Sequence, residues 1–233
     1  MWLSLLGVLA YALYYWRAYQ PALKRNDWGL LIGLLLLTVI ANIFILRPFA
    51  SSARPLPNLP VQAPGSALIV FSAIPWLLSG GLLGPMGAAA IGAFAGLLRG
   101  TLDSYSLFSL LEFALMGAWF SENMRQRYRT PIYGLLRQPI VCAILLIPIH
   151  TFFYIVIALF TQWGVDIPAT ARLDFALSNT WIVTATFGIE MLVGGIVAQI
   201  ISMSFPAAWG GKQPLQPSPG EKSLESRFLF AVG

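Results

Sequence analysis

The sequence predicts an all-α polytopic membrane protein, a bundle of about seven transmembrane helices. Of its 233 residues, 58% are hydrophobic and only 10% are charged, with a mean hydropathy of +0.74, whereas a soluble domain carries about 25% charged residues. The apolar residues form long unbroken runs, which favours helices over strands that would alternate every second residue. Basic residues collect in every second loop between these runs, as expected for alternating membrane crossings.

The apolar runs define the expected spans. A hydrocarbon core of about 30 Å needs about 20 apolar residues in a helix, and the short fourth and fifth runs are expected to be tilted or shielded by neighbours. The first run ends in aromatic residues beside Arg17 and lacks a small-residue cleavage site, which indicates a retained helix and not a signal peptide. The expected spans are residues 2–16, 28–46, 67–83, 86–98, 107–120, 139–163 and 175–205.

Lys and Arg counts predict the orientation. One set of loops holds Arg17, Lys24, Arg25, Arg125, Arg127, Arg129, Arg137, Lys212, Lys222 and Arg227, and the other set holds Arg47, Arg54, Arg99 and Arg172. Ten against four predicts an outside N-terminus and a cytoplasmic C-terminus. We therefore expect a multi-pass protein of the bacterial plasma (inner) membrane.

The composition divides the chain into a transmembrane domain (residues 1–208), a cytoplasmic linker (209–226) and a short apolar end (227–233). The loop over residues 47–66 carries five prolines and is expected to be extended and irregular. The apolar end has two interpretations. It is the start of a further transmembrane helix in a longer chain, or an ordinary C-terminus that docks on the membrane.

The most informative segment is glycine-rich and covers residues 80–100. Gly92 and Gly96 share one helical face, with Ala88 one turn earlier, and small residues at this spacing let another helix backbone approach closely. Pro85 suits the first turn of a helix, where no backbone donor is needed. The pattern predicts a hairpin tip at Gly84–Pro85 and a tightly packed helix after it.

A family resemblance rests on the order Gly84, Pro85, Ala88, Gly92, Gly96, Arg99. Residues 67–120 resemble the Lyt-type five-transmembrane receptor region of bacterial sensor histidine kinases. Similar glycine-rich helices occur in substrate-binding subunits of energy-coupling-factor vitamin transporters and in a membrane scaffold of the rod-shape machinery. The first resemblance implies a sensory input module whose output domain lies beyond residue 233.

Four ionisable residues fall in or beside the apolar runs: Arg99, Glu112, His150 and Glu190. Such residues are costly in a membrane and indicate function with a partner. One hypothesis gathers Glu112, His150 and Glu190 around a polar cavity that binds a small ligand or relays protons, since histidine titrates nearest neutrality. Pro148, two residues before His150, is expected to kink that helix.

The structural alternative satisfies each group locally. Arg99 would then neutralise Glu112 from the end of the preceding helix. Glu190 would be protonated, or bonded to Thr184, Thr186 or a backbone carbonyl.

Several function classes are excluded. One cysteine and one histidine give no disulfide framework and no cluster of metal ligands, and no hydrolase, metalloprotease or phosphate-loop motif is found. We expect no enzyme activity, no cofactor or metal, and no nucleic-acid partner. The expected partners are the lipid bilayer, a small-molecule ligand, and a second copy of the chain or a downstream signalling domain.

Three functions remain in order of preference. The first is a sensory or receptor input module of a bacterial signal-transduction protein. The second is a substrate-binding membrane subunit of a vitamin-type uptake transporter. The third is a scaffold protein of the cell envelope.

Overall fold

The computed structural model describes residues 25–47, 67–104, 106–160, 168–210 and 215–217, together with positions 6, 7, 9–11 and 14. Of these residues 81% are helical, and no β-strand is found among them. The elements are α2 (Arg25–Ile43), α3 (Ala73–Leu82), α4 (Pro85–Arg99), the π-helical turn η1 (Gly100–Ser104), α5 (Phe108–Arg125), α6 (Pro131–Leu136), α7 (Pro139–Phe160) and α8 (Ala169–Ser204).

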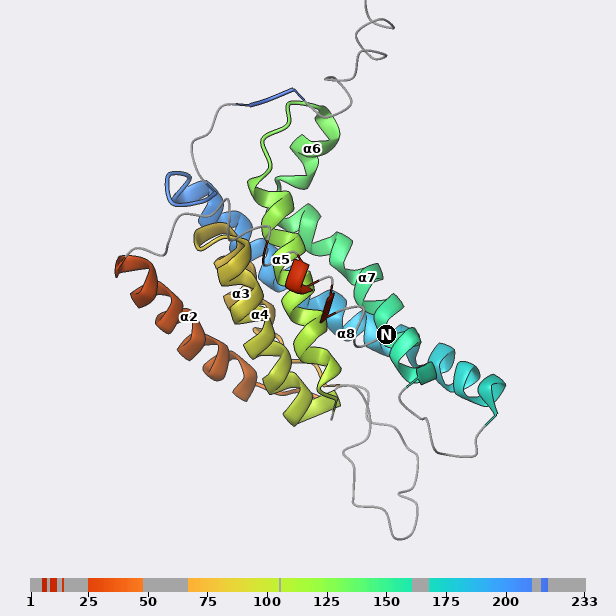
Figure 1. Ribbon diagram of the computed structural model, residues 1–233. Helices are drawn as coiled ribbons and strands as arrows, with labels where there is room; N and C mark the ends of the chain where they lie inside the picture. Colours follow the sequence, from red (N-terminus) through yellow and green to blue (C-terminus); the bar gives the residue numbers. More distant parts are fainter. Residues whose placement is uncertain are drawn as a thin grey trace, which may run out of the picture.

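Helices α3, α4 and α5 form one packed unit (Figure 1). α3 and α4 are joined by a tight turn in which Gly84 has a φ of 91° and Pro85 begins α4. That left-handed conformation favours glycine, and proline is well suited to the first position of a helix. α4 and α5 then run antiparallel, because Gly92 lies against the backbone of Phe113 and Gly96 against that of Ser109.

Helices α7 and α8 form a second, longer hairpin. Gly195 of α8 faces Ile140 and Ala143 of α7, and the hydroxyls of Thr151 and Thr184 lie 2.9 Å apart further along the pair. α8 has 36 residues, which at 1.5 Å per residue makes it about 54 Å long. The α7–α8 hairpin therefore extends past the other helices at one end (Figure 1).

The two units share one apolar core. Trp76 of α3 packs edge-on against Phe113 and Phe120 of α5, and Phe113 packs in the same way against Phe187 of α8. Gly194 of α8 faces α3 closely enough that an added Cβ would lie 2.7 Å from atoms of Ala73 and Leu77. α2 covers the opposite side, where it packs on α3 and α4 (Figure 1).

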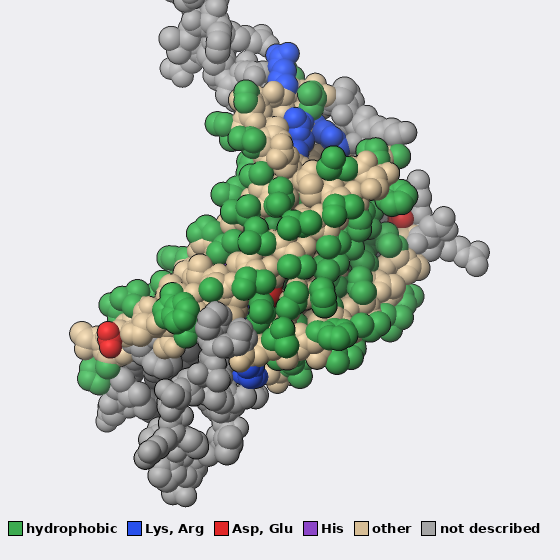
Figure 2. All heavy atoms as spheres, turned by 180° about the vertical axis from the view of Figure 1, so that it is seen from behind, with side chains coloured by type: hydrophobic (Ala, Val, Ile, Leu, Met, Phe, Trp, Pro, Cys, Tyr) green, Lys and Arg blue, Asp and Glu red, His purple; other side chains and the backbone are tan. Residues whose placement is uncertain are grey.

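The helix ends collect at two opposite ends of the molecule. At one end α2 stops beside the start of α3, where Leu46 and Leu68 exchange backbone hydrogen bonds of 2.9 and 2.8 Å. At the other end lie the Gly84 turn, α6 and the exit of α8, since Gly210 donates a backbone hydrogen bond to the carbonyl of Gly81. Figure 2 shows Lys and Arg side chains gathered mainly at the end that carries α6.

The expected spans differ from the helices found. The expected helix over 67–83 contains only ten helical residues, because residues 67–72 leave the helix to pair with Leu46, which follows α2, and to bond Glu190. α8 begins at Ala169, six residues before the expected 175, and the short helix α6 was not expected. Of the expected helix over 2–16, only positions 6, 7, 9–11 and 14 are described, and these are helical. Most of the proline-rich loop and the apolar end at 227–233 lie outside the described residues.

In the described part of the chain, two helices are long and apolar enough to cross a membrane: Pro139–Ile157 within α7, and Ala169–Ser204. α2 and α3 are apolar but shorter. An all-helical architecture is thus found, whereas seven separate spans remain a prediction.

Candidate functional site

The polar residues predicted from the sequence form one buried ion pair and one buried histidine–carboxylate pair, and each pair joins the α3–α5 unit to the α7–α8 hairpin. Arg99 of α4 pairs with Glu190 of α8, and Glu112 of α5 pairs with His150 of α7. All four side chains are at most 10% exposed. The two units are therefore held together by charged groups as well as by the aromatic core.

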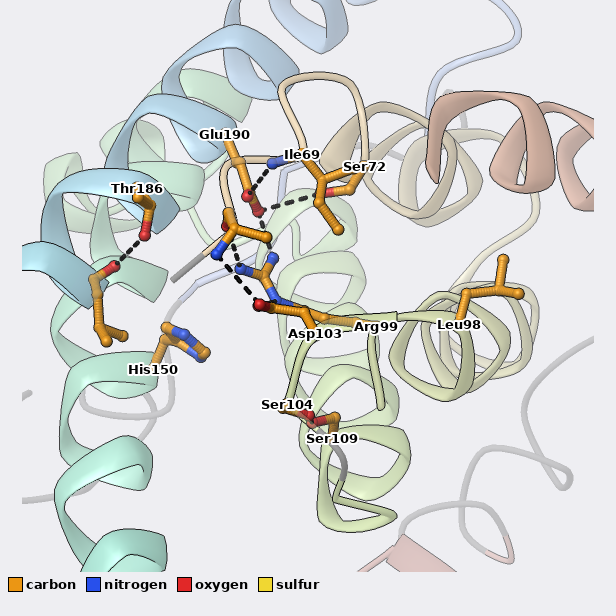
Figure 3. A network of polar contacts seen from close by, with 12 residues as sticks. Ile69, Ser72, Leu98, Arg99, Asp103, Ser104, Ser109, His150, Thr186 and Glu190 are labelled. Carbon is orange, nitrogen blue, oxygen red and sulfur yellow. Dashed lines mark hydrogen bonds and ion pairs between the residues drawn. The ribbon is translucent and has the colours of Figure 1, made fainter. Parts of the chain in front are cut away.

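Glu190 is the most enclosed of these residues, with no exposed surface. Its Oε2 accepts hydrogen bonds from Nη1 of Arg99 at 2.5 Å and from the hydroxyl of Ser72 at 3.1 Å. Its Oε1 accepts the backbone N–H of Ile69 at 2.8 Å (Figure 3). A carboxylate is tolerated in an apolar interior only when it is paired and hydrogen-bonded in this manner.

Arg99 extends the network towards the end of the molecule. Its Nη2 donates to the carbonyl of Ala67 at 3.4 Å, and its Nε lies 3.7 Å from Oδ2 of Asp103 in η1. Asp103, which lies beside Arg99 in Figure 3, accepts the backbone N–H of Ala67 at 3.1 Å. It also lies 3.9 Å from Arg47, four residues beyond the end of α2. Charges of opposite sign thus alternate from Glu190 to the partly exposed Arg47.

The second pair is a single short contact. Nδ1 of His150 lies 2.6 Å from Oε1 of Glu112. The imidazole stacks on Phe187 of α8, with ring centres 3.9 Å apart, and meets the edge of Phe113. His150 therefore touches α5 and α8 at once, although it belongs to α7.

Phe113 separates the two pairs. The guanidinium carbon of Arg99 lies 5.7 Å from the centre of its ring, within the range of a cation–π contact, and His150 meets the same ring. Phe187, which stacks on His150, precedes Glu190 by less than one turn of α8. The two pairs thus contact opposite parts of one aromatic cluster.

The local sequence explains how these side chains reach one another. Pro148 lies inside α7, two residues before His150, where a proline frees a carbonyl of the preceding turn. The π-helical turn after α4 carries Asp103 back to Arg99, its neighbour four residues earlier. Residues 67–72 are non-helical, so their backbone groups are available to Glu190 and Asp103.

Two expected pairings are wrong. Arg99 pairs with Glu190 and Asp103 instead of Glu112, because the glycine seam sets α4 and α5 in a register that leaves Glu112 facing α7. Glu190 bonds to Arg99, Ser72 and Ile69 and not to a threonine. The threonines expected as its partners are engaged elsewhere: Thr186 with carbonyls of its own helix, and Thr184 with Thr151.

Three members of the network were missed by sequence reasoning. Asp103 carried a usable signal, since an acid four residues after an arginine lies on the same helical face. Arg47 and Ser72 carried none, because their roles depend on how distant segments fold together.

The helix-packing residues form the seam between α4 and α5. An added Cβ at Gly92 or Gly96 would collide with a backbone carbonyl of α5, and one at Gly117 of α5 would lie 2.6 Å from the carbonyl oxygen of Ala88. Pro85 starts α4 at the near end of this seam. These backbone contacts thus fix the register of α4 against α5, and with it the position of Arg99 relative to Glu112 along the two helices.

The buried set has an excess of acids. Asp103, Glu112 and Glu190 share one guanidinium, that of Arg99, and one imidazole, that of His150. The partly exposed Arg47 balances one of these negative charges from the end of the network. Within the described residues no group of three His, Cys, Asp or Glu side chains is arranged to hold a metal ion. The chemistry available to this set is proton uptake and the binding of a small polar or charged group.

Comparison with known proteins adds no relative. No protein-family model, no curated protein and no solved structure matches the chain. The roles of these residues therefore rest on their own geometry.

Proposed function

We propose that the chain is the membrane-embedded input module of a bacterial signalling protein, which senses a ligand, a proton or the state of the membrane. The observation that carries this proposal is the position of Glu190. It joins the buried charge network to α8, the helix that leads to the C-terminal tail.

The first support is the apolar surface. Large hydrophobic side chains are exposed along the outer face of α2, with Ile32, Leu36 and Ile43 each more than half exposed. Hydrophobic side chains also run along the whole length of the face in Figure 2. Soluble monomers rarely expose apolar patches on this scale, so the surface favours a lipid environment and a multi-pass arrangement.

The second support is that the two buried pairs sit at the junction of two packed units. Loss of one charge from a buried ion pair is costly, because the other charge then stays buried without a partner. Protonation, or a ligand that competes for Glu112 or Glu190, would therefore change how tightly the α7–α8 hairpin is held. Switches of this kind need only a local charge change and an element with two arrangements.

The third support is the continuity of α8. The 15 residues from Glu190 to Ser204 span about 21 Å of uninterrupted helix, so a displacement at Glu190 reaches the end of the molecule that carries the tail. The resemblance of residues 67–120 to a receptor region of sensor kinases agrees with this direction of signal flow, with the output domain expected after the tail.

The proposal is tested by a distance measurement in lipid nanodiscs. Spin labels are placed at Leu36→Cys on α2 and Met203→Cys on α8, which are 61% and 72% exposed, in a Cys142→Ala background. Glu190→Gln is expected to shift or broaden the distance between the labels, because it removes the charge that holds α8 to Arg99.

Asp174→Asn is the matched control, since Asp174 is an exposed acid on the same helix. An identical distance distribution in the parent protein, Glu190→Gln and Asp174→Asn would show a static bundle and would favour the scaffold function. Co-purification of the unaltered protein with an ATPase would favour the transporter subunit.

A further inference from the structure

The chain does not leave the bundle freely after α8. Trp209, five residues beyond the helix, is only 8% exposed. Its indole occupies the space above Gly81 near the end of α3, where an added Cβ would lie 2.5 Å from ring atoms Cδ2 and Cζ2. Gly210, at a φ of 69°, then donates its backbone N–H to the carbonyl of Gly81 at 3.0 Å. The absence of a side chain at Gly81 thus makes the seat for Trp209.

Two arginines close the same contact. Arg125 of α5 donates to the carbonyls of Gly80 and Gly81 at 3.3 and 3.1 Å, and Arg127 donates to the carbonyl of Gly210 at 2.6 Å. The last carbonyls of a helix have no partner within the helix. Arg125 and Gly210 supply the partners of the Gly81 carbonyl at the end of α3, and the Gly80 carbonyl also accepts the hydroxyl of Ser121 at 2.7 Å.

The tail touches the bundle a second time, after residues that lie outside the described part. The N–H of Gln216 donates to the carbonyl of Arg127 at 2.7 Å, and the N–H of Arg129 donates to the carbonyl of Gln216 at 3.0 Å. Gln216 therefore lies beside Tyr128 in a short parallel pairing. Main-chain pairing of this kind accepts an extended segment of almost any sequence.

We propose that the residues after α8, from Phe205 to Gly210 together with 215–217, form a releasable latch. Trp209 in its seat on Gly81 is the closing contact, and release of the latch passes a displacement of α8 into the tail. This inference rests on the proposed sensory function and gives that function its output step.

The character of the contacts supports release. One indole ring, the Arg127 guanidinium and two short main-chain pairings hold the tail at the end of the molecule, and segments with so few buried contacts open at a free-energy cost well below that of global unfolding. The latch also grips three elements at once, α3, α5 and the α5–α6 loop. A movement of α8 relative to α3 therefore displaces Trp209 from its contact with Gly81.

Disulfide trapping measures the closed state in the full chain. Tyr128→Cys and Gln216→Cys are introduced in the Cys142→Ala background, because adjacent strand positions lie within reach of a disulfide. The protein is oxidised in lipid nanodiscs, and the cross-linked fraction is read from a gel after protease cleavage between the two positions.

Gly81→Ala is the test variant, since its methyl group would occupy the space of the indole. It is expected to lower the cross-linked fraction several-fold. Gly33→Ala is the matched control, because the same methyl group on α2 meets nothing within 4 Å. Trp209→Ala is the second variant, since it empties the seat without adding a clash, and it is expected to act like Gly81→Ala.

An unchanged cross-linked fraction in both Gly81→Ala and Trp209→Ala would overturn the latch. The distance between Leu36 and Met203 tests the sensory proposal separately, because both labels precede the latch. If Glu190→Gln shifts the label distance but leaves the cross-linked fraction equal to that of Asp174→Asn, the latch is contradicted and the sensory function is not. Reduced cross-linking in Gly81→Ala with an unshifted distance in Glu190→Gln contradicts the sensory function alone.

Discussion

Glu190 and Arg99 illustrate how a charged pair is held in an apolar interior. Every oxygen of the carboxylate has a donor, and Arg99 has a second acid in Asp103 and a carbonyl in Ala67. The attraction between buried charges does little more than offset the cost of removing them from water. The stability of the pair therefore depends on both partners remaining charged.

Removal of one partner is therefore expected to cost more than removal of both. Arg99→Leu leaves a buried carboxylate without its cation and should destabilise the protein by about 3–5 kcal/mol. The double variant Arg99→Leu/Glu190→Leu should recover part of that loss, because no unpaired charge remains. Chemical unfolding in detergent, followed by circular dichroism, measures both. Additive losses in the double variant would show that the two residues do not act as a pair.

The pair formed by His150 and Glu112 predicts a particular proton position. At 2.6 Å from Oε1 of Glu112, Nδ1 is expected to carry a proton in a strong hydrogen bond to the carboxylate. Nitrogen NMR tests this without ambiguity, since the chain has a single histidine. We expect a protonated Nδ1 with a strongly downfield proton at neutral pH, and an upfield move of that proton in Glu112→Gln. A bare Nδ1 in the parent protein would contradict the pairing.

Sequence reasoning at the residue scale found the charged groups but not their partners. Arg99, Glu112, His150 and Glu190 stand out because charges are rare in apolar runs. The Arg99–Glu190 contact joins residues 91 positions apart, and nothing local in the sequence encodes it. Arg99 and Glu112 were expected to pair because they are close in the chain, and the register of the helices decided otherwise.

At the scale of elements, the seam between α4 and α5 is the most constrained feature. Glycines on both helices let the backbones touch, with Gly92 and Gly96 on one side and Gly117 on the other. Close approach maximises dispersion contacts, which are the main attraction between helices where lipid removes the hydrophobic drive. The seam also sets the position of Arg99 along α5, so the buried charge network depends on the seam.

Gly96→Ala is accordingly expected to be disruptive. Its methyl group would overlap the carbonyl of Ser109, which is backbone and cannot rotate away. Overpacking of this kind costs about 1–3 kcal/mol or more, against a gain in helix propensity of about 1 kcal/mol. A lower unfolding midpoint in detergent is expected for Gly96→Ala. Gly33→Ala, with the same gain in propensity and open space around it, should not lower the midpoint, and equal midpoints would contradict the seam.

The glycine pattern predicted the bounds of α4 well, whereas the predicted length of α3 was too great. Periodic small residues and the Gly84–Pro85 turn are local signals, and α4 begins and ends within a residue of the expected 86–98. Residues 67–72 are as apolar as the helix that follows them. They leave the helical conformation because Leu46, Asp103 and Glu190 bind their backbone groups, and no property of the segment itself reveals those partners.

The whole molecule places its helix ends at two opposite poles. Arg47, Arg99 and Asp103 meet near one pole, and Arg125, Arg127 and the exit of α8 meet at the other. The Lys and Arg counts predicted this alternation, because each loop between antiparallel helices returns to the pole opposite the previous one. Assignment of the poles to the two sides of a membrane remains a prediction.

Cysteine labelling in intact cells tests that assignment. Thr101→Cys lies in η1 near the Arg99 pole, and Ile132→Cys lies in α6 at the other pole; both positions are exposed. The native Cys142 is buried and replaced by alanine. A membrane-impermeant maleimide is expected to label Thr101→Cys in intact cells, and Ile132→Cys only after the cells are opened, because basic loops stay on the cytoplasmic side. Labelling of Ile132→Cys alone would reverse the orientation, and labelling of both in intact cells would contradict a membrane lying between the poles.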